Sequence, residues 1–204
     1  MDDARFMARA IELARGQLGR TAPNPPVGCV IVKDGQVVSE AATASGGRPH
    51  AEEIAAPMAG EAARGATAYV TLEPCGGRSS GRTSCAQHLV DAGVSRVVIA
   101  SEDPSRFAAG RGVEKLRAAG LEVETGLMRE KAASLLSGYL HRMSTGRPLV
   151  EIADGGDGFD GRFVAAPGAD LGAELTRLGE AGYMRLWTPP GPLAEELKRR
   201  GLLS

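Results

Sequence analysis

Near the N-terminus, apolar side chains recur at the spacing of one helix face. This pattern predicts an amphipathic helix over residues 2–19, and the side chains that form it are Phe6, Met7, Ala10, Ile11, Ala14 and Leu18. The next segment, Pro23-Asn24-Pro25-Pro26, is predicted to be a loop. Consecutive prolines are excluded from both a helix interior and the hydrogen-bond ladder of a sheet.

The segment after this loop has the pattern of a β-hairpin. Apolar stretches at residues 27–33 and 36–42 flank Asp34-Gly35. Asp-Gly between two such stretches is the strongest short-range hairpin signal, because both turn positions need a positive φ.

Further along, apolar stretches of helical and strand period alternate. The pattern predicts strands over 66–72, 96–101 and 121–125, and helices over 50–60, 85–93, 110–119 and 127–142. A hairpin followed by strand–helix alternation indicates an α/β fold. We expect a mixed sheet of about five strands between two helix layers, a three-layer α/β/α arrangement.

The composition changes after Gly146. Residues 153–173 are rich in glycine, alanine and aspartate without a sustained period, and helices over 170–181 and 192–201 with a short strand at 183–187 follow. We therefore divide the chain into a domain of residues 1–147 and a C-terminal appendage of residues 148–204, which is too small for an independent enzyme domain.

Composition and charge narrow the range of partners. Apolar residues make up 43% and charged residues 24%, as in an average globular protein, and the net charge is −1. This balance gives no electrostatic footprint for nucleic acid, and 4% aromatic residues offer few platforms for base stacking. The sequence contains no apolar run of the ~18–20 residues that cross a membrane and no signal-peptide pattern. We expect a cytoplasmic protein that acts on a small molecule.

The candidate chemistry lies in two short segments. Pro49-His50-Ala51-Glu52 stands at a predicted helix start, and Leu72-Glu73-Pro74-Cys75 ends a predicted strand, with Cys85 at the next helix start. One imidazole and two thiolates form a three-ligand Zn²⁺ site with an open fourth position, which can lower the pKa of a bound water to about 7. Glu52 is close enough in sequence to move a proton without being a ligand. This is the His-x-Glu and Pro-Cys pattern of zinc deaminases.

Each piece alone has a simpler explanation. His-x-Glu arises by chance on helix surfaces, and the two cysteines could be buried thiols at element ends, as we expect for Cys29 in its apolar strand. Their combination, with Pro74 before the first cysteine, favours the metal site. Three cysteines are too few for a disulfide scaffold in a chain of 204 residues.

Over about residues 3–150 the sequence resembles the deaminase half of the bifunctional deaminase–reductases of riboflavin biosynthesis. The resemblance is carried by segments 21–28 (TAPNPPVG), 49–52 (PHAE), 69–75 (YVTLEPC), 81–83 (GRT), 91–94 (DAGV), 103–104 (DP) and 145–148 (TGRP). It implies a cytidine-deaminase-like fold, with Zn²⁺ held by His50, Cys75 and Cys85 and with Glu52 as proton shuttle.

The resemblance also implies a substrate, a substrate contact and an oligomer. The substrate would be a diaminohydroxyphosphoribosylaminopyrimidine, a phosphorylated amino-pyrimidine. Asn24 would hydrogen-bond it, although an Asx-type loop residue between prolines explains Asn24 as well. Members of this fold commonly associate through helices, so we expect a homodimer or larger homo-oligomer, for which the apolar face of residues 127–139 could serve.

Departures from the family pattern surround the pocket. Thr43 stands where the family has histidine, Ser105 replaces the asparagine of Asp-Pro-Asn, and residues 76–80 form a rebuilt, longer loop. Nine residues separate the two cysteines, where zinc deaminases usually have two. We interpret Thr43 and Ser105 as substrate contacts. Arg82 is either a phosphate ligand or a solvated loop arginine.

The reductase half of the family protein is missing. Phe159-Asp160-Gly161-Arg162 weakly resembles its start, so we interpret the appendage as a reductase remnant and expect no reductase activity. Three functions stay open: a riboflavin-type deaminase, a deaminase of the same family recruited to another amino-heterocycle or nucleobase, and a non-catalytic zinc-bearing subunit. Glu52 argues against the third, since a structural zinc site does not need that carboxylate.

Overall fold

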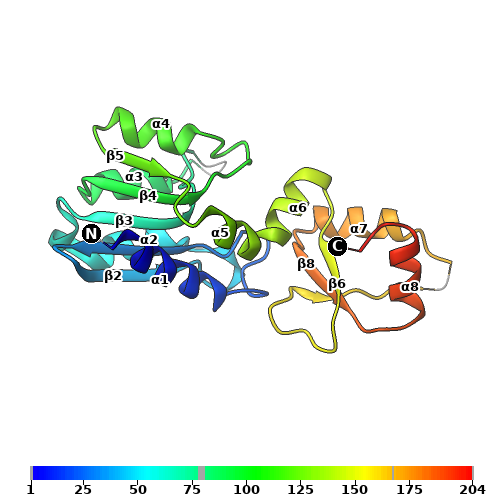
Figure 1. The fold of residues 1–204 in the computed structure, drawn as a ribbon. Coiled ribbons are helices and arrows are strands. Elements are labelled where there is room, and N and C mark those ends of the chain that lie inside the picture. The colour runs from blue at the N-terminus through cyan, green and yellow to red at the C-terminus, as the bar shows by residue number, and fades with distance from the viewer. Residues whose placement is uncertain (1, 78–80, 167, 204) are drawn as a thin grey trace.

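The computed structural model describes residues 2–77, 81–166 and 168–203, and its main feature is a five-stranded sheet (Figure 1). The strands lie in the order β2-β1-β3-β4-β5, which are Gln36–Ala42, Gly28–Lys33, Thr67–Leu72, Arg96–Ser101 and Glu122–Thr125. β1 pairs antiparallel with β2 and β3, whereas β3, β4 and β5 run parallel. The expected mixed sheet is confirmed.

The hairpin forms as its turn residues predict. Asp34 and Gly35 have φ values of +50° and +77°, and Lys33 pairs with Gln36 across the turn. A register shift between Ile31 and Val32 adds a bulge to the ladder. Near the opposite end of the hairpin, β1 begins at the loop that carries Asn24.

Helices cover both faces of this sheet, which confirms the three-layer fold. On one face, α1 (Asp3–Arg15) and α5 (Arg129–Leu135) enclose a core with side chains of β1, β3 and β4. On the other face lie α2 (Ala51–Ala59), α3 (Cys85–Asp91) and α4 (Arg111–Ala118). Two short 3-10 helices, Ser45–Gly47 and Gly60–Ala63, flank α2. Among the described residues, no helix is long and apolar enough to cross a membrane.

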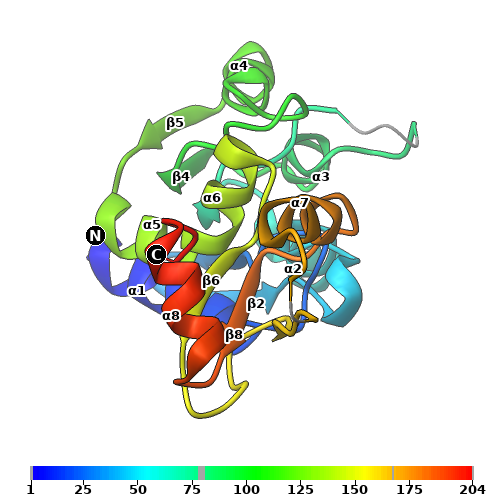
Figure 2. The same ribbon diagram turned by 90° about the vertical axis from the view of Figure 1, so that its right-hand side faces the viewer.

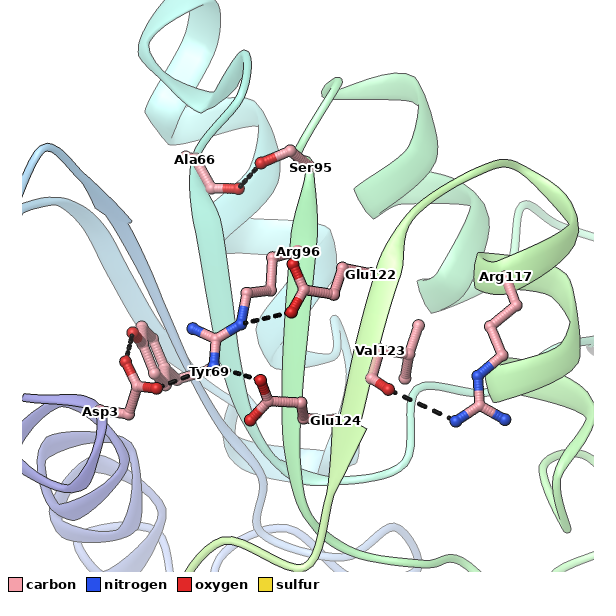
Figure 3. Close-up of polar contacts among 9 residues, drawn as sticks. All are labelled: Asp3, Ala66, Tyr69, Ser95, Arg96, Arg117, Glu122, Val123 and Glu124. Carbon is pink, nitrogen blue, oxygen red and sulfur yellow. Dashed lines mark hydrogen bonds and ion pairs between the residues drawn. The ribbon is translucent and has the colours of Figure 1, made fainter. Parts of the chain in front are cut away.

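A cluster of charged groups joins α1 to the sheet (Figure 3). Asp3 accepts hydrogen bonds from the Tyr69 hydroxyl at 2.7 Å and from Arg96 Nη2 at 2.8 Å, and Arg96 also donates to Glu124. The hydrogen bond from Arg96 lowers the pKa of the Asp3 carboxyl, and burial together with Asp3 raises the pKa of Tyr69 to about 12. This cluster fixes the start of α1 against β3 and β4.

The single helix predicted over residues 127–142 is wrong. The structure has two helices, α5 and α6 (Ser137–Thr145), which meet at Leu136 with φ −89° and ψ 7°. The apolar side chains on both sides of the break, Ala132, Leu135, Leu136 and Tyr139, are buried within the chain. The apolar face expected to serve self-association is therefore used in the protein's own core.

The residues after α6 form a second, smaller unit, which we call the C-terminal unit (residues 148–204; Figures 1 and 2). Its parallel sheet has the order β6-β8-β7, with strands Leu149–Ile152, Arg185–Thr188 and Gly161–Arg162. α7 (Leu171–Glu180) and α8 (Pro192–Arg199) cover it. The sequence pattern found β8 and both helices but missed β6 and β7. The unit has its own core, made of Val150, Phe163, Leu171, Leu175, Leu186 and Leu197.

Candidate active site

Three metal-ligating side chains converge where β3 ends between two helices. His50 precedes α2, Cys75 follows β3, and Cys85 is the first residue of α3. Their ligand atoms all lie within 4.8 Å of one another, and they form the one such group found among the described residues. His50 Nδ1 is 3.2 Å from Cys85 Sγ, and the Cys85 backbone N–H donates to Cys75 Sγ at 3.3 Å.

This spacing fits a zinc ion. Bonds of about 2.3 Å to sulfur and about 2.0 Å to nitrogen put neighbouring ligand atoms of a tetrahedral zinc roughly 3.5–3.8 Å apart. Two sulfurs and one imidazole nitrogen are also the donor set that zinc prefers. Three protein ligands leave one coordination position for water or substrate, as in catalytic zinc sites.

Backbone contacts hold the ligands in place. The His50 N–H donates to Glu53 Oε2 at 2.8 Å, which fixes the start of α2. Glu73, two residues before Cys75, is buried, and its carboxylate accepts from the backbone N–H groups of Gly110, Gly112 and Val113. A Cβ on Gly112 would lie 1.9 Å from the Pro74 carbonyl oxygen. The start of α4 is thus packed directly against the segment that presents Cys75, which gives Gly110-Arg111-Gly112 a structural role.

Glu52 lies beside the ligands in the first turn of α2. It is only 3% exposed and borders the same cavity as His50, Cys75 and Cys85. Burial raises the pKa of its carboxyl, and the neighbouring His50 opposes that shift. The one buried carboxylate of this helix is therefore placed next to the metal ligands.

The cavity has a volume of about 470 Å³, which suits a small heterocyclic substrate. The three side chains interpreted from the sequence as substrate contacts, Asn24, Thr43 and Ser105, line this cavity. Asn24 donates from Nδ2 to the Gly47 carbonyl at 2.9 Å. The buried Thr43 hydroxyl accepts from the Val27 N–H at 3.0 Å, so this side chain supports the start of β1 as well as lining the cavity.

Arg82 is placed elsewhere. It borders a separate hollow with Pro49, Glu53, Gly81, Thr83 and His88, and the described residues that line the catalytic cavity do not include it. Arg78, Ser79 and Ser80 of the rebuilt loop lie outside the described residues. Cys29 is fully buried in β1, as expected for a core thiol.

The cavity wall also contains a hydrogen-bonded group of Tyr139, Asp103 and Ser105, which the sequence did not predict. Tyr139 of α6 donates from its hydroxyl to Asp103 Oδ1 at 2.7 Å, and the Ser105 N–H donates to the same oxygen at 2.8 Å. Burial and Asp103 raise the pKa of Tyr139. Arg48, Arg106 and Arg142 also line the cavity. Asp103 belongs to the Asp-Pro motif that the sequence shows, whereas no motif marks Tyr139 within the helix predicted over residues 127–142.

Comparisons with known proteins agree with this geometry. The model of the cytidine and deoxycytidylate deaminase zinc-binding region matches residues 1–101. The chain is 50% identical over 169 residues to the riboflavin biosynthesis protein RibD of Escherichia coli, covering 82% of this chain and 45% of that protein. It is 45% identical over 149 residues to the diaminohydroxyphosphoribosylamino-pyrimidine deaminase of Buchnera aphidicola, covering 72% of this chain and all of that protein. The structure of Acinetobacter baumannii RibD has a TM-score of 0.81 at 28% identity and matches 98% of this chain and 84% of its own.

The fold and the site define a zinc-dependent deaminase. The chain belongs to the family of diaminohydroxyphosphoribosylaminopyrimidine deaminases, which includes the deaminase part of RibD. It spans about half the length of the RibD proteins that it matches.

Proposed function

We propose that this protein hydrolyses the exocyclic amine of a ribosylamino-pyrimidine phosphate, the riboflavin-type substrate. The observation that carries the proposal is the buried Glu52 carboxylate in the same 470 Å³ cavity as the three zinc ligands. The match over the whole of the Buchnera deaminase supports the substrate class. A non-catalytic subunit would have no use for a buried carboxylate there.

In the proposed reaction a water attacks the ring carbon that carries the amine. A C–O bond forms, the C–N bond breaks, and ammonia leaves. When bound by His50, Cys75 and Cys85, zinc supplies the Lewis acidity that makes water nucleophilic at neutral pH. Glu52 takes the proton of the attacking water and delivers it to the departing nitrogen.

Two other side chains orient the ring in this proposal. Asn24 uses Nδ2 for the Gly47 carbonyl, which leaves Oδ1 to accept from a ring amine. The Ser105 backbone N–H donates to Asp103, which Tyr139 fixes in turn, so the backbone of Ser105 is held at the cavity wall. Thr43 shapes the wall between them.

The second candidate is a deaminase of the same family that acts on another amino-heterocycle. The placement of Arg82 in a separate hollow favours it, because a phosphate ligand is expected to border the substrate cavity. The Thr43 hydroxyl, which accepts from the Val27 N–H just before β1 and not from a free donor in the cavity, also favours it. Ammonia release from a panel of amino-pyrimidines and amino-purines separates the two candidates.

Arg82→Ala tests the phosphate contact. If Arg82 binds the phosphate, the variant should raise KM on the phosphorylated pyrimidine about ten- to a hundredfold, since a charge-assisted contact contributes roughly 1.5–3 kcal/mol. KM for the dephosphorylated analogue should not change. Arg15→Ala is the matched control, because Arg15 is exposed at the end of α1. Equal effects on both substrates would favour the recruited deaminase.

We propose that residues 1–147 are the deaminase domain and that the C-terminal unit is a remnant of the reductase domain. The separate core of the unit supports this division. The alignment of nearly the whole chain with Acinetobacter baumannii RibD supports the remnant. Incubation of the product with a reduced nicotinamide cofactor should give no turnover, and a measurable rate would contradict the proposal.

We propose a homo-oligomer in the cytoplasm. The chain has three cysteines, and the metal site needs two of them as reduced thiolates, which supports a reducing compartment. Light scattering at micromolar concentration should give a mass of at least twice 21.1 kDa. A single species of monomer mass would contradict the self-association.

A further inference from the structure

The loop that carries Asn24, residues 20–26, is fixed on one side by the turn that precedes His50. Besides the bond from Asn24 Nδ2 to the Gly47 carbonyl, the Gly46 N–H donates to the Arg20 carbonyl at 2.8 Å. A Cβ on Gly47 would lie 2.4 Å from the Thr21 carbonyl oxygen, so the two backbones are in direct contact. One side of the Asn24 loop therefore rests on the 3-10 helix Ser45–Gly47, just before His50.

The other side of the same loop contacts the C-terminal unit. Gly182, with φ +100°, packs on Pro23, and a Cβ there would lie 2.5 Å from Pro23 Cβ. Arg142 Nη1 donates both to the Gly182 carbonyl at 2.8 Å and to the Pro23 carbonyl at 3.1 Å. One guanidinium nitrogen thus joins the C-terminal unit to the residue next to Asn24.

Hydrogen bonds within the C-terminal unit fix the segment that follows Gly182. Asp160 Oδ2 accepts from the N–H groups of Met184 and Arg185 at 2.7 and 2.9 Å, which fixes the segment after Gly182. The Met184 side chain is 4% exposed and belongs to the core beneath the five-stranded sheet. A cavity of only about 20 Å³ remains between the two units, room for about one water.

From these contacts we propose that the C-terminal unit acts as a positioning element for the deaminase, holding the Asn24 loop through Gly182 and Arg142. The proposal rests on the proposed function only in that Asn24 is taken to bind the substrate. The C-terminal unit then contributes to the proposed deamination although it catalyses no reaction itself. A displacement of the loop by about 1 Å is enough to weaken a positioned contact substantially.

Gly182→Ala tests the proposal, because the added methyl group must push Pro23 away. We expect faster backbone hydrogen exchange at Arg20, Thr21, Ala22 and Asn24, the residues of this loop that have a backbone N–H. Exchange in residues 67–77 and the zinc content should stay at the level of the parent protein. On the phosphorylated pyrimidine, KM should rise about tenfold while kcat changes less than about threefold, the signature of lost binding alone. Gly201→Ala is the matched control: Gly201 also has a positive φ, +65°, but no atom lies within 4 Å of an added Cβ.

Arg142→Met is the second variant if the alanine disturbs folding. The methionine side chain fills much of the same space but has no N–H to donate to either carbonyl, so exchange in residues 20–26 should again rise. Unchanged exchange in the Asn24 loop, or a rise no larger than in Gly201→Ala, would overturn the proposal. The exchange measurement needs no substrate. A failure of the proposed function would appear separately, as absent turnover by the parent protein.

Discussion

Glu52→Gln should reduce kcat by at least about a hundredfold and leave the zinc content and the melting temperature close to those of the parent protein. The amide has the shape of the carboxylate, but it cannot accept the proton of the attacking water and pass it to the leaving amine. Glu52 is buried beside the ligands and borders the cavity, so its carboxylate is placed to carry this proton. Ammonia release at saturating substrate, with metal analysis of the same sample, measures the effect.

Glu53→Gln is the matched control for this variant. Glu53 is the next residue of α2 and borders the other hollow, with Arg82. Its role at His50 is to accept a backbone hydrogen bond, which an amide oxygen also does. We expect activity within about threefold of the parent, since an acceptor of the same geometry remains. If Glu52→Gln stays in that same range, another group carries the proton.

The sequence predicted the large sheet well because its strands carry their own signals. Asp34-Gly35 encodes the hairpin turn locally, and the buried strands β3 and β4 are rich in apolar and β-branched residues. The break at Leu136 could not be predicted, because apolar side chains continue on both sides of it. β7 has two residues, too few for any period to appear.

The residues of the site divide in the same way: local motifs predict some of them, and contacts between distant positions determine the others. His50, Glu52, Cys75 and Cys85 are each marked by a short motif at the end of an element, and the fold brings them together. The pairing of Tyr139 with Asp103 joins residues 36 positions apart, and no local pattern encodes it. The bridge from Arg142 to Pro23 spans 119 positions. Contacts of this kind arise from tertiary packing alone.

Cys75→Ser should remove most of the zinc, and with it both activity and stability. A serine hydroxyl stays protonated at neutral pH and is a much poorer zinc ligand than a thiolate. The site joins the end of β3 to the starts of α2 and α3, so zinc binding also stabilises the fold. At free zinc of about a hundred times Kd, binding adds about 2.7 kcal/mol. At about 2–4 °C per kcal/mol for a chain of this size, the melting temperature should fall roughly 5–10 °C.

Metal analysis and thermal unfolding, each with and without a chelator, test this expectation. The parent protein should hold about one zinc per chain and lose stability when chelated, whereas Cys75→Ser should melt at the same temperature under both conditions. Cys29→Ala is the matched control: Cys29 is the third cysteine of the chain, it is buried in β1 and is not one of the three grouped ligands, and its loss should leave the zinc content unchanged. If the parent protein holds less than a tenth of a zinc per chain even after reconstitution, the metal assignment is refuted. Retention of zinc by Cys75→Ser would instead show that Cys75 is not a ligand, because His50 and Cys85 alone are one protein ligand short of a catalytic zinc site and two short of a structural one.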